Sequence, residues 1–110
     1  MNSQKQVLIA DLRIADRMWS RMQGLLGTRE LASHEGLWIH RCNSIHTFFM
    51  NYAIDCIFVD SELRILATRK NVRPWRIVWP VLGARSVFEL KSGQIELWQV
   101  SPGEQLYVGT

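Results

Sequence analysis

Short runs of apolar residues, rich in β-branched and aromatic side chains and bounded by turn residues, predict that most of the chain forms strands. Asp60, Ser61 and Glu62 fit a hairpin turn between two of these runs. Because proline cannot donate to a strand ladder, the segment RPWRIVWP at residues 73–80, with Pro74 and Pro80 near its ends, is expected in a loop or at a sheet edge. The predicted strands span residues 6–14, 36–41, 45–49, 54–59, 63–68, 84–90 and 105–108.

One stretch follows the period of a helix instead. Asp16 is a suitable N-cap, and Gly27 is a plausible stop. Between them, apolar residues recur at helical spacing at Met18, Trp19, Met22, Leu25 and Leu26, which predicts an amphipathic helix of about three turns. The pattern of residues 95–100 leaves helix and strand open.

These elements predict a mostly β, α+β fold. We expect a small barrel-like or strongly bent antiparallel or mixed sheet of about six to eight short strands, with one N-terminal amphipathic helix. The 110 residues are expected to form a single domain, residues 1–110. A hydrophobic share of 47% and a charged share of 21% argue for a folded chain rather than a disordered one.

Composition also gives an expected location. No segment approaches the ~18 consecutive apolar residues that a membrane span requires. Asp11 interrupts the N-terminal region before an apolar stretch of secretory length forms, so no signal peptide is expected. With only two cysteines, Cys42 and Cys56, we expect reduced thiols and a cytoplasmic protein.

Positive charge is concentrated in one part of the chain. The net charge is only +3, but residues 63–88 contain six cations and no acid: Arg64, Arg69, Lys70, Arg73, Arg76 and Arg85. Trp75 and Trp79 interleave with these arginines. The segment predicts either a solvated face or a surface for an acidic protein partner or another polyanion, with weak nucleic-acid binding as one form of the latter.

An ordered series of short motifs resembles the bacterial and archaeal family named domain of unknown function 192. RMQGLLG at residues 21–27 resembles its RGLMGR element, and Gly36-Leu37 resembles its GMLF step. FELKSG at residues 88–93 is similar to VLELPAG, and SPGE at residues 101–104 to the closing xxGD. The central signature, FWMKNT…PLDxxFxD, is matched by a shorter variant, HTFFM at residues 46–50 followed by IDCIFVD at residues 54–60, without the Asn-Thr pair and the proline. The resemblance implies a compact, mostly β single domain and brings no established activity.

The polar cluster CNSIHT, residues 42–47, directly before an apolar run, is the main candidate site. A metal site would draw on His40, Cys42, His46 and Cys56, but their spacing matches no CxxC or HxxxH pairing. A thiol-dependent hydrolase would use Cys42 as nucleophile, His46 as base and Asp55 as the orienting group.

Two further interpretations of this cluster require no reaction. A binding pocket would present Asn43, Ser44, His46 and Thr47 beside Phe48, Phe49 and Met50. Alternatively, the polar groups satisfy the backbone of an irregular crossover.

Asp55 lies in AIDCIFVD, a run that is apolar on both faces, so its strand is expected to be covered on both sides. A buried carboxylate needs partners, and we expect backbone N–H groups of the turn at residues 50–52, or His46 and an arginine. Asp55 is therefore predicted to be a structural clamp.

The sequence favours a non-enzymatic binding module over an enzyme. The small ligand or protein partner would contact Asn43, Ser44, His46, Thr47 and Met50 together with Arg73, Trp75 and Arg76. The thiol-dependent hydrolase and the polyanion binder are the alternatives, and neither a cofactor nor a metal is expected.

Overall fold

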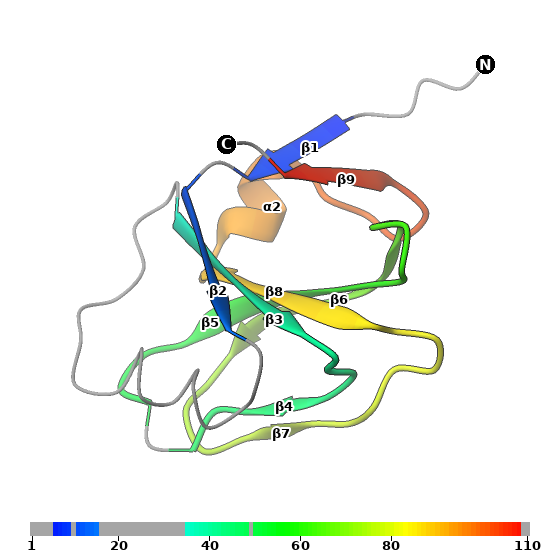
Figure 1. The fold of residues 1–110 in the computed structure, drawn as a ribbon. Coiled ribbons are helices and arrows are strands. Elements are labelled where there is room, and N and C mark those ends of the chain that lie inside the picture. Colours follow the sequence, from blue (N-terminus) through cyan, green and yellow to red (C-terminus); the bar gives the residue numbers. More distant parts are fainter. Residues whose placement is uncertain (1–5, 10, 16–34, 49, 109–110) are drawn as a thin grey trace.

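The computed structural model describes residues 6–9, 11–15, 35–48 and 50–108 (Figure 1). The amphipathic helix predicted over residues 16–27 lies outside these residues. The described elements are β1 (Gln6–Ile9), β2 (Asp11–Ala15), β3 (Glu35–His40), β4 (Ile45–His46), β5 (Ile54–Val59), β6 (Ile65–Val72), β7 (Ile77–Val78), β8 (Ser86–Lys91), α2 (Gln94–Trp98) and β9 (Gln105–Val108).

A mixed five-stranded sheet in the order β2-β3-β8-β5-β6 forms the centre of the fold. Its first pair, β2 and β3, is parallel, and the other three pairs are antiparallel. Two smaller sheets pair β1 with β9 and β4 with β7. The mostly β class is confirmed, but the described strands form three separate sheets and do not close into a barrel.

Strand β5, inside the central sheet, is buried on both faces, because its alternate residues enter different hydrophobic clusters. Ile54, Cys56 and Phe58 of β5 pack with residues of β4 and β7 in one cluster. Ile57 and Val59 pack with residues of α2 and β9 in the other. Figure 1 shows the same arrangement, with the β4–β7 sheet on one side of the central sheet and α2 with the β1–β9 sheet on the other. The expectation that the 54–59 strand is covered on both sides is confirmed, since all six residues are buried.

Several predicted elements differ from the structure, among them the strand predicted at 63–68, which is found at Ile65–Val72 as β6. Residues 6–14 form two strands rather than one, because β1 pairs with β9 whereas β2 pairs with β3. The predicted strand at 45–49 ends at His46, since the Met50 N–H bonds back to the Thr47 carbonyl in a turn. The stretch 95–100, which the sequence left open between helix and strand, overlaps the short helix α2 at residues 95–98. Among the described residues, no helix has both the length and the apolar character to cross a membrane.

Candidate functional site

The β4–β7 sheet joins the two regions that the sequence marked separately, the polar cluster and the basic loop. Ile45 of β4 pairs with Val78 of β7, and His46 pairs with Ile77. The side chains of Ile45 and Val78 face the core, where they anchor the small sheet to the central one. Residues 43–48 and the loop that precedes β7 therefore form one continuous part of the molecule.

Thr47 fastens this junction. Its side chain is fully buried, and its Oγ1 donates to the Arg73 carbonyl at 2.6 Å and accepts from the Arg76 N–H at 2.9 Å. Its backbone N–H donates to the Arg76 carbonyl, and its carbonyl accepts from the Trp75 N–H, both at 2.9 Å. Thr47, predicted as a ligand contact, thus holds the 73–76 turn through both its side chain and its backbone.

Three aromatic rings form a ladder above this junction. The rings of His46 and Phe48 lie 4.7 Å apart between centroids, and Phe48 stacks on Trp75 at 5.6 Å with an interplanar angle of 26°. The Phe48 N–H also donates to His46 Nδ1 at 3.3 Å, which fixes the ring of His46 relative to the backbone. Trp75, at the end of the ladder, is 56% exposed.

A groove separates β6 from β7. The two strands are joined by only four residues, 73–76, yet β6 pairs with β5 and β7 pairs with β4. The strands therefore diverge from their connecting turn and leave a cavity of about 320 Å³ between them. Three cations and four apolar residues line it: Arg69, Lys70, Val72, Arg76, Ile77, Val78 and Trp79.

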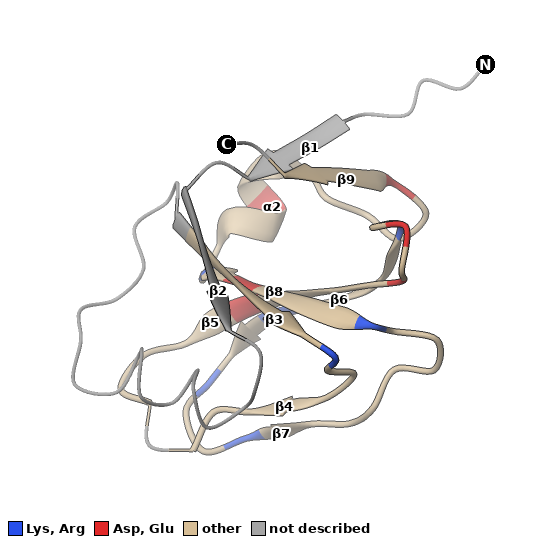
Figure 2. Ribbon diagram, viewed as in Figure 1, with Lys and Arg blue, Asp and Glu red and all other residues tan. Residues whose placement is uncertain are grey.

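The region around β4 and β7 is positive. Residues 41–54 and 63–88, which build it, contain no aspartate or glutamate. In Figure 2, the blue segments near β7 have no red neighbours among the described residues of β4, β7 and their loops. Glu89 of β8 is fully buried. Lys70 contacts the exposed Glu96 of α2 at 3.7 Å, whereas Arg69, Arg73 and Arg76 remain exposed.

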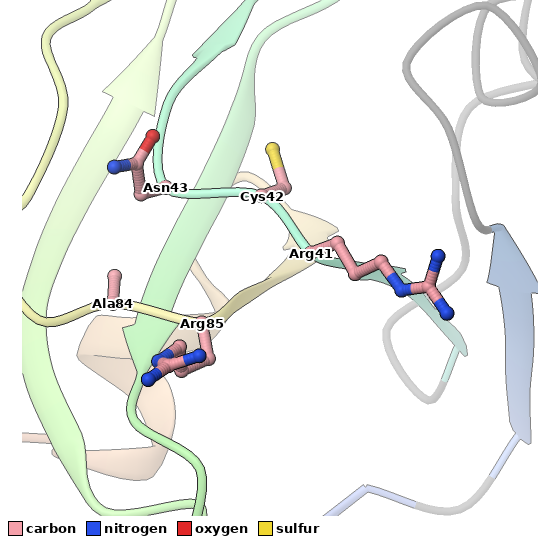
Figure 3. Close-up of a pocket in the computed structure, with 5 residues that line it drawn as sticks. All are labelled: Arg41, Cys42, Asn43, Ala84 and Arg85. Atoms are coloured by element: carbon pink, nitrogen blue, oxygen red, sulfur yellow. The ribbon is translucent and has the colours of Figure 1, made fainter.

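A second cavity, of about 360 Å³, lies beside Cys42 and is lined by Arg41, Cys42, Asn43, Ala84 and Arg85. Figure 3 shows that the side chains of Arg41 and Arg85 extend in different directions. Asn43 is exposed, and its carbonyl accepts from the Val81 N–H at 2.9 Å. The polar groups of this cavity do not converge on one point, which a site for a small anion would require.

The thiol-dependent hydrolase has no geometric support from the described contacts. The Cys42 thiol donates to the Ser44 carbonyl at 2.7 Å, and His46 Nδ1 accepts from the backbone. Asp55 is fully buried and accepts three backbone hydrogen bonds, so its carboxylate is occupied by the fold. Each of the three residues thus forms hydrogen bonds with backbone groups.

The residues considered for a metal site are likewise dispersed in their contacts. His40, at the end of β3, packs its ring against Trp38 at 4.3 Å, and Cys56 is buried within β5. Within the described part of the chain, no three His, Cys, Asp or Glu side chains are grouped so that they could hold a metal ion.

Two features escaped the sequence reasoning. Met50, expected at the binding region, is buried in the core. Ile77, which lines the groove, and Leu82 were not singled out from the sequence, and they are 56% and 98% exposed, respectively. A partial signal was present, because Pro80 and Gly83 flank Leu82 and mark a turn whose residues often lie at the surface.

Comparison with known families explains the motif series. The model of the DUF192 family, described as "Uncharacterized ACR", matches residues 1–108. The chain belongs to this family. It is similar to a UPF0127 protein of Thermococcus sibiricus, with 35% identity over 100 residues that cover 86% of this chain and 64% of that protein. It is also similar to a UPF0127 protein of Pyrococcus horikoshii, with 33% identity over 99 residues that cover 87% of this chain and 85% of the relative.

Two solved structures share the fold of this DUF192 chain. A protein of unknown function from Novosphingobium aromaticivorans superposes with a TM-score of 0.74 at 22% identity, covering 86% of this chain and 71% of the other. A proposed transcription regulator from Sinorhizobium meliloti superposes with a TM-score of 0.73 at 25% identity, covering 86% and 78%, respectively. The first likeness shows the fold alone. The chain thus spans about two thirds of the Thermococcus relative's length and most of each solved chain.

Proposed function

We propose that this protein is a non-enzymatic binding module for an acidic partner. The partner would contact a surface made of Arg69, Arg73, Trp75, Arg76 and Trp79, here called the basic aromatic surface. The observation that carries the proposal is the junction of β4 with β7, which places the aromatic ladder and the exposed arginines in one positive region.

The composition of this surface suits partner binding. Arginine and tryptophan are enriched among the residues that dominate binding energy at protein interfaces. Trp75 and Trp79 are 56% and 76% exposed, which is a large apolar area to leave in water. The arginines would attract a negatively charged partner, and the tryptophans would bury apolar surface on contact.

The description of the Sinorhizobium protein as a proposed transcription regulator fits a role in binding better than a role in catalysis. The contacts of Cys42, His46 and Asp55 point the same way, since each is satisfied by backbone groups.

Heparin, a flexible polyanion, provides the test. Its affinity for the protein is measured by calorimetry at low and at high salt, and it should fall steeply as salt rises because binding releases counterions. An Arg73→Glu/Arg76→Glu variant should bind heparin about tenfold or more weakly.

The matched control is Arg41→Glu/Arg85→Glu, which changes the net charge equally at the cavity beside Cys42. It should retain most of the affinity. Absence of heparin binding at low salt, or equal losses in the two double variants, would refute a localised surface.

A further inference from the structure

Trp75 is held in a backbone conformation that a tryptophan rarely adopts. Its φ is 64°, in the left-handed region where a Cβ is crowded by the backbone. Such strain persists only where surrounding contacts determine it, and it clusters at functional positions. Here the surrounding contacts are those of Thr47, which binds the backbone of Arg73, Trp75 and Arg76.

The fold does not use this conformation to bury the indole. Burial would be the ordinary reason to tolerate strain at a large apolar residue, yet the Trp75 side chain is 56% exposed. The ring is instead oriented by the ladder, since it stacks on Phe48 and Phe48 packs on His46. The result is a flat aromatic surface of fixed orientation at the exterior.

The positive charges around Trp75 indicate which kind of ligand would bind there. Arg73 and Arg76 flank the indole in sequence, both are exposed, and Arg69 lies on the neighbouring β6. Exposed guanidinium groups disfavour a cationic ligand and favour one that carries negative charge. A planar ring beside a regularly spaced negative charge is the repeating unit of a nucleic acid.

We infer that Trp75 is a stacking platform for a base of single-stranded nucleic acid, with Arg73 and Arg76 contacting the adjacent phosphates. This inference rests on the proposed function, because it names the partner of the same surface. Single strands are specified since their bases are unstacked and can lie against an aromatic ring, whereas bases in a duplex are occupied by their neighbours. Stacking on an aromatic ring is also tolerant of sequence, so no particular sequence is required.

The test compares three polyanions, of which only one carries nucleobases. A fluorescein-labelled oligo-dT dodecamer, an abasic dodecamer with the same sugar-phosphate backbone, and heparin are titrated with the protein at low salt. The oligo-dT should bind at least about fivefold more tightly than the abasic strand, because only the former offers bases for stacking. This comparison uses the unaltered protein and does not depend on the folding of any variant.

Substitution of the platform gives the second measurement. Trp75→Leu should lower the affinity for oligo-dT by at least about fivefold, while the affinities for the abasic strand and for heparin change by less than about twofold. Trp75→Phe, which keeps an aromatic ring, should restore much of the loss. Circular dichroism of each variant verifies that the fold is retained.

The outcomes separate this inference from the proposed function. If the protein binds none of the three anions, both fail. If heparin and the abasic strand bind as tightly as oligo-dT, the acidic-partner proposal stands and the stacking platform is refuted. Equal losses for all three anions in Trp75→Leu would also refute it, since they would show a general disturbance of the surface.

Discussion

The carboxylate of Asp55 accepts a hydrogen bond from the backbone N–H of Ile95 at 2.8 Å, forty residues along the chain. The same Oδ2 accepts from the Gly93 N–H at 3.1 Å, and Oδ1 accepts from the Asn71 N–H at 2.8 Å. Asp55 thus binds the start of α2 to the sheet and also reaches the irregular part of β6. Gly93, the N-cap residue of α2, supplies no side chain to cap the helix, so a carboxylate from a distant strand does so.

Removing this carboxylate should destabilise the fold strongly. Asp55→Ala leaves three backbone N–H groups without their acceptor at a fully buried position, and the free energy of unfolding should fall by about 1–3 kcal/mol or more. Asp60→Ala is the matched control, because the Asp60 carboxylate likewise accepts backbone hydrogen bonds, here two. These lie at an exposed turn, where water can replace the carboxylate. Urea denaturation measures both, and an unchanged midpoint for Asp55→Ala would contradict the clamp.

The hydroxyl of Thr47 should stabilise the turn that presents Trp75. Thr47→Val keeps the shape of the side chain but leaves the Arg73 carbonyl and the Arg76 N–H unsatisfied, so we expect a loss of about 1–3 kcal/mol. Thr47→Ser should restore most of it. Near-ultraviolet circular dichroism should show a weaker aromatic signal in Thr47→Val, since the Phe48–Trp75 stack depends on the turn. A variant with unaltered stability and spectrum would show that Thr47 is not the fastening residue.

The two cysteines should differ in accessibility. Neither Cys42 nor Cys56 forms a disulfide, and Cys42 is half-buried whereas Cys56 is fully buried. Alkylation without reductant should therefore modify Cys42 in the folded protein and Cys56 only after unfolding, as mass spectrometry can follow. A single disulfide-linked form would contradict this prediction. Rapid modification of Cys42 well below the pH at which an ordinary thiol ionises would instead support the thiol-dependent hydrolase.

Gly93 should resist replacement for a reason of backbone geometry alone. Its φ is 97°, and an added Cβ would meet no atom within 4 Å, so a clash is not involved. Gly93→Ala should nevertheless lower the free energy of unfolding by about 1–2 kcal/mol, because alanine is strained in a left-handed conformation. Gly93→Asn should lose less, since asparagine adopts this region more readily. Thermal unfolding of the two variants gives the order, and an alanine variant as stable as the wild type would overturn the argument.

The sequence predicted those features of the fold that depend on the residues of a single segment. The uninterrupted apolar run of residues 54–59 predicted a strand covered on both sides, and β5 has these bounds and is entirely buried. The same run implied that Asp55 must be satisfied by the fold, which its three backbone bonds confirm. The motif series identified the family, and Pro74 and Pro80 indicated the edge position of the short β7.

Pairing between distant segments could not be obtained in this way. The sequence placed the partners of Asp55 in the 50–52 turn or at His46 and an arginine, which was wrong, because they come from β6 and α2. It also did not reveal that residues 6–14 divide between two sheets.

The junction of β4 with β7, on which the basic aromatic surface depends, was decided only by tertiary structure. Periodicity and composition report whether a residue is buried and which way its strand alternates, and these are properties of the local chain. Which strand lies beside another depends instead on the sum of many weak packing terms against the entropy of closing each loop. The sequence thus specified a positive segment that contains tryptophan. Only the fold could stack Trp75 on Phe48 and bring the Thr47 hydroxyl to the backbone of Arg73 and Arg76.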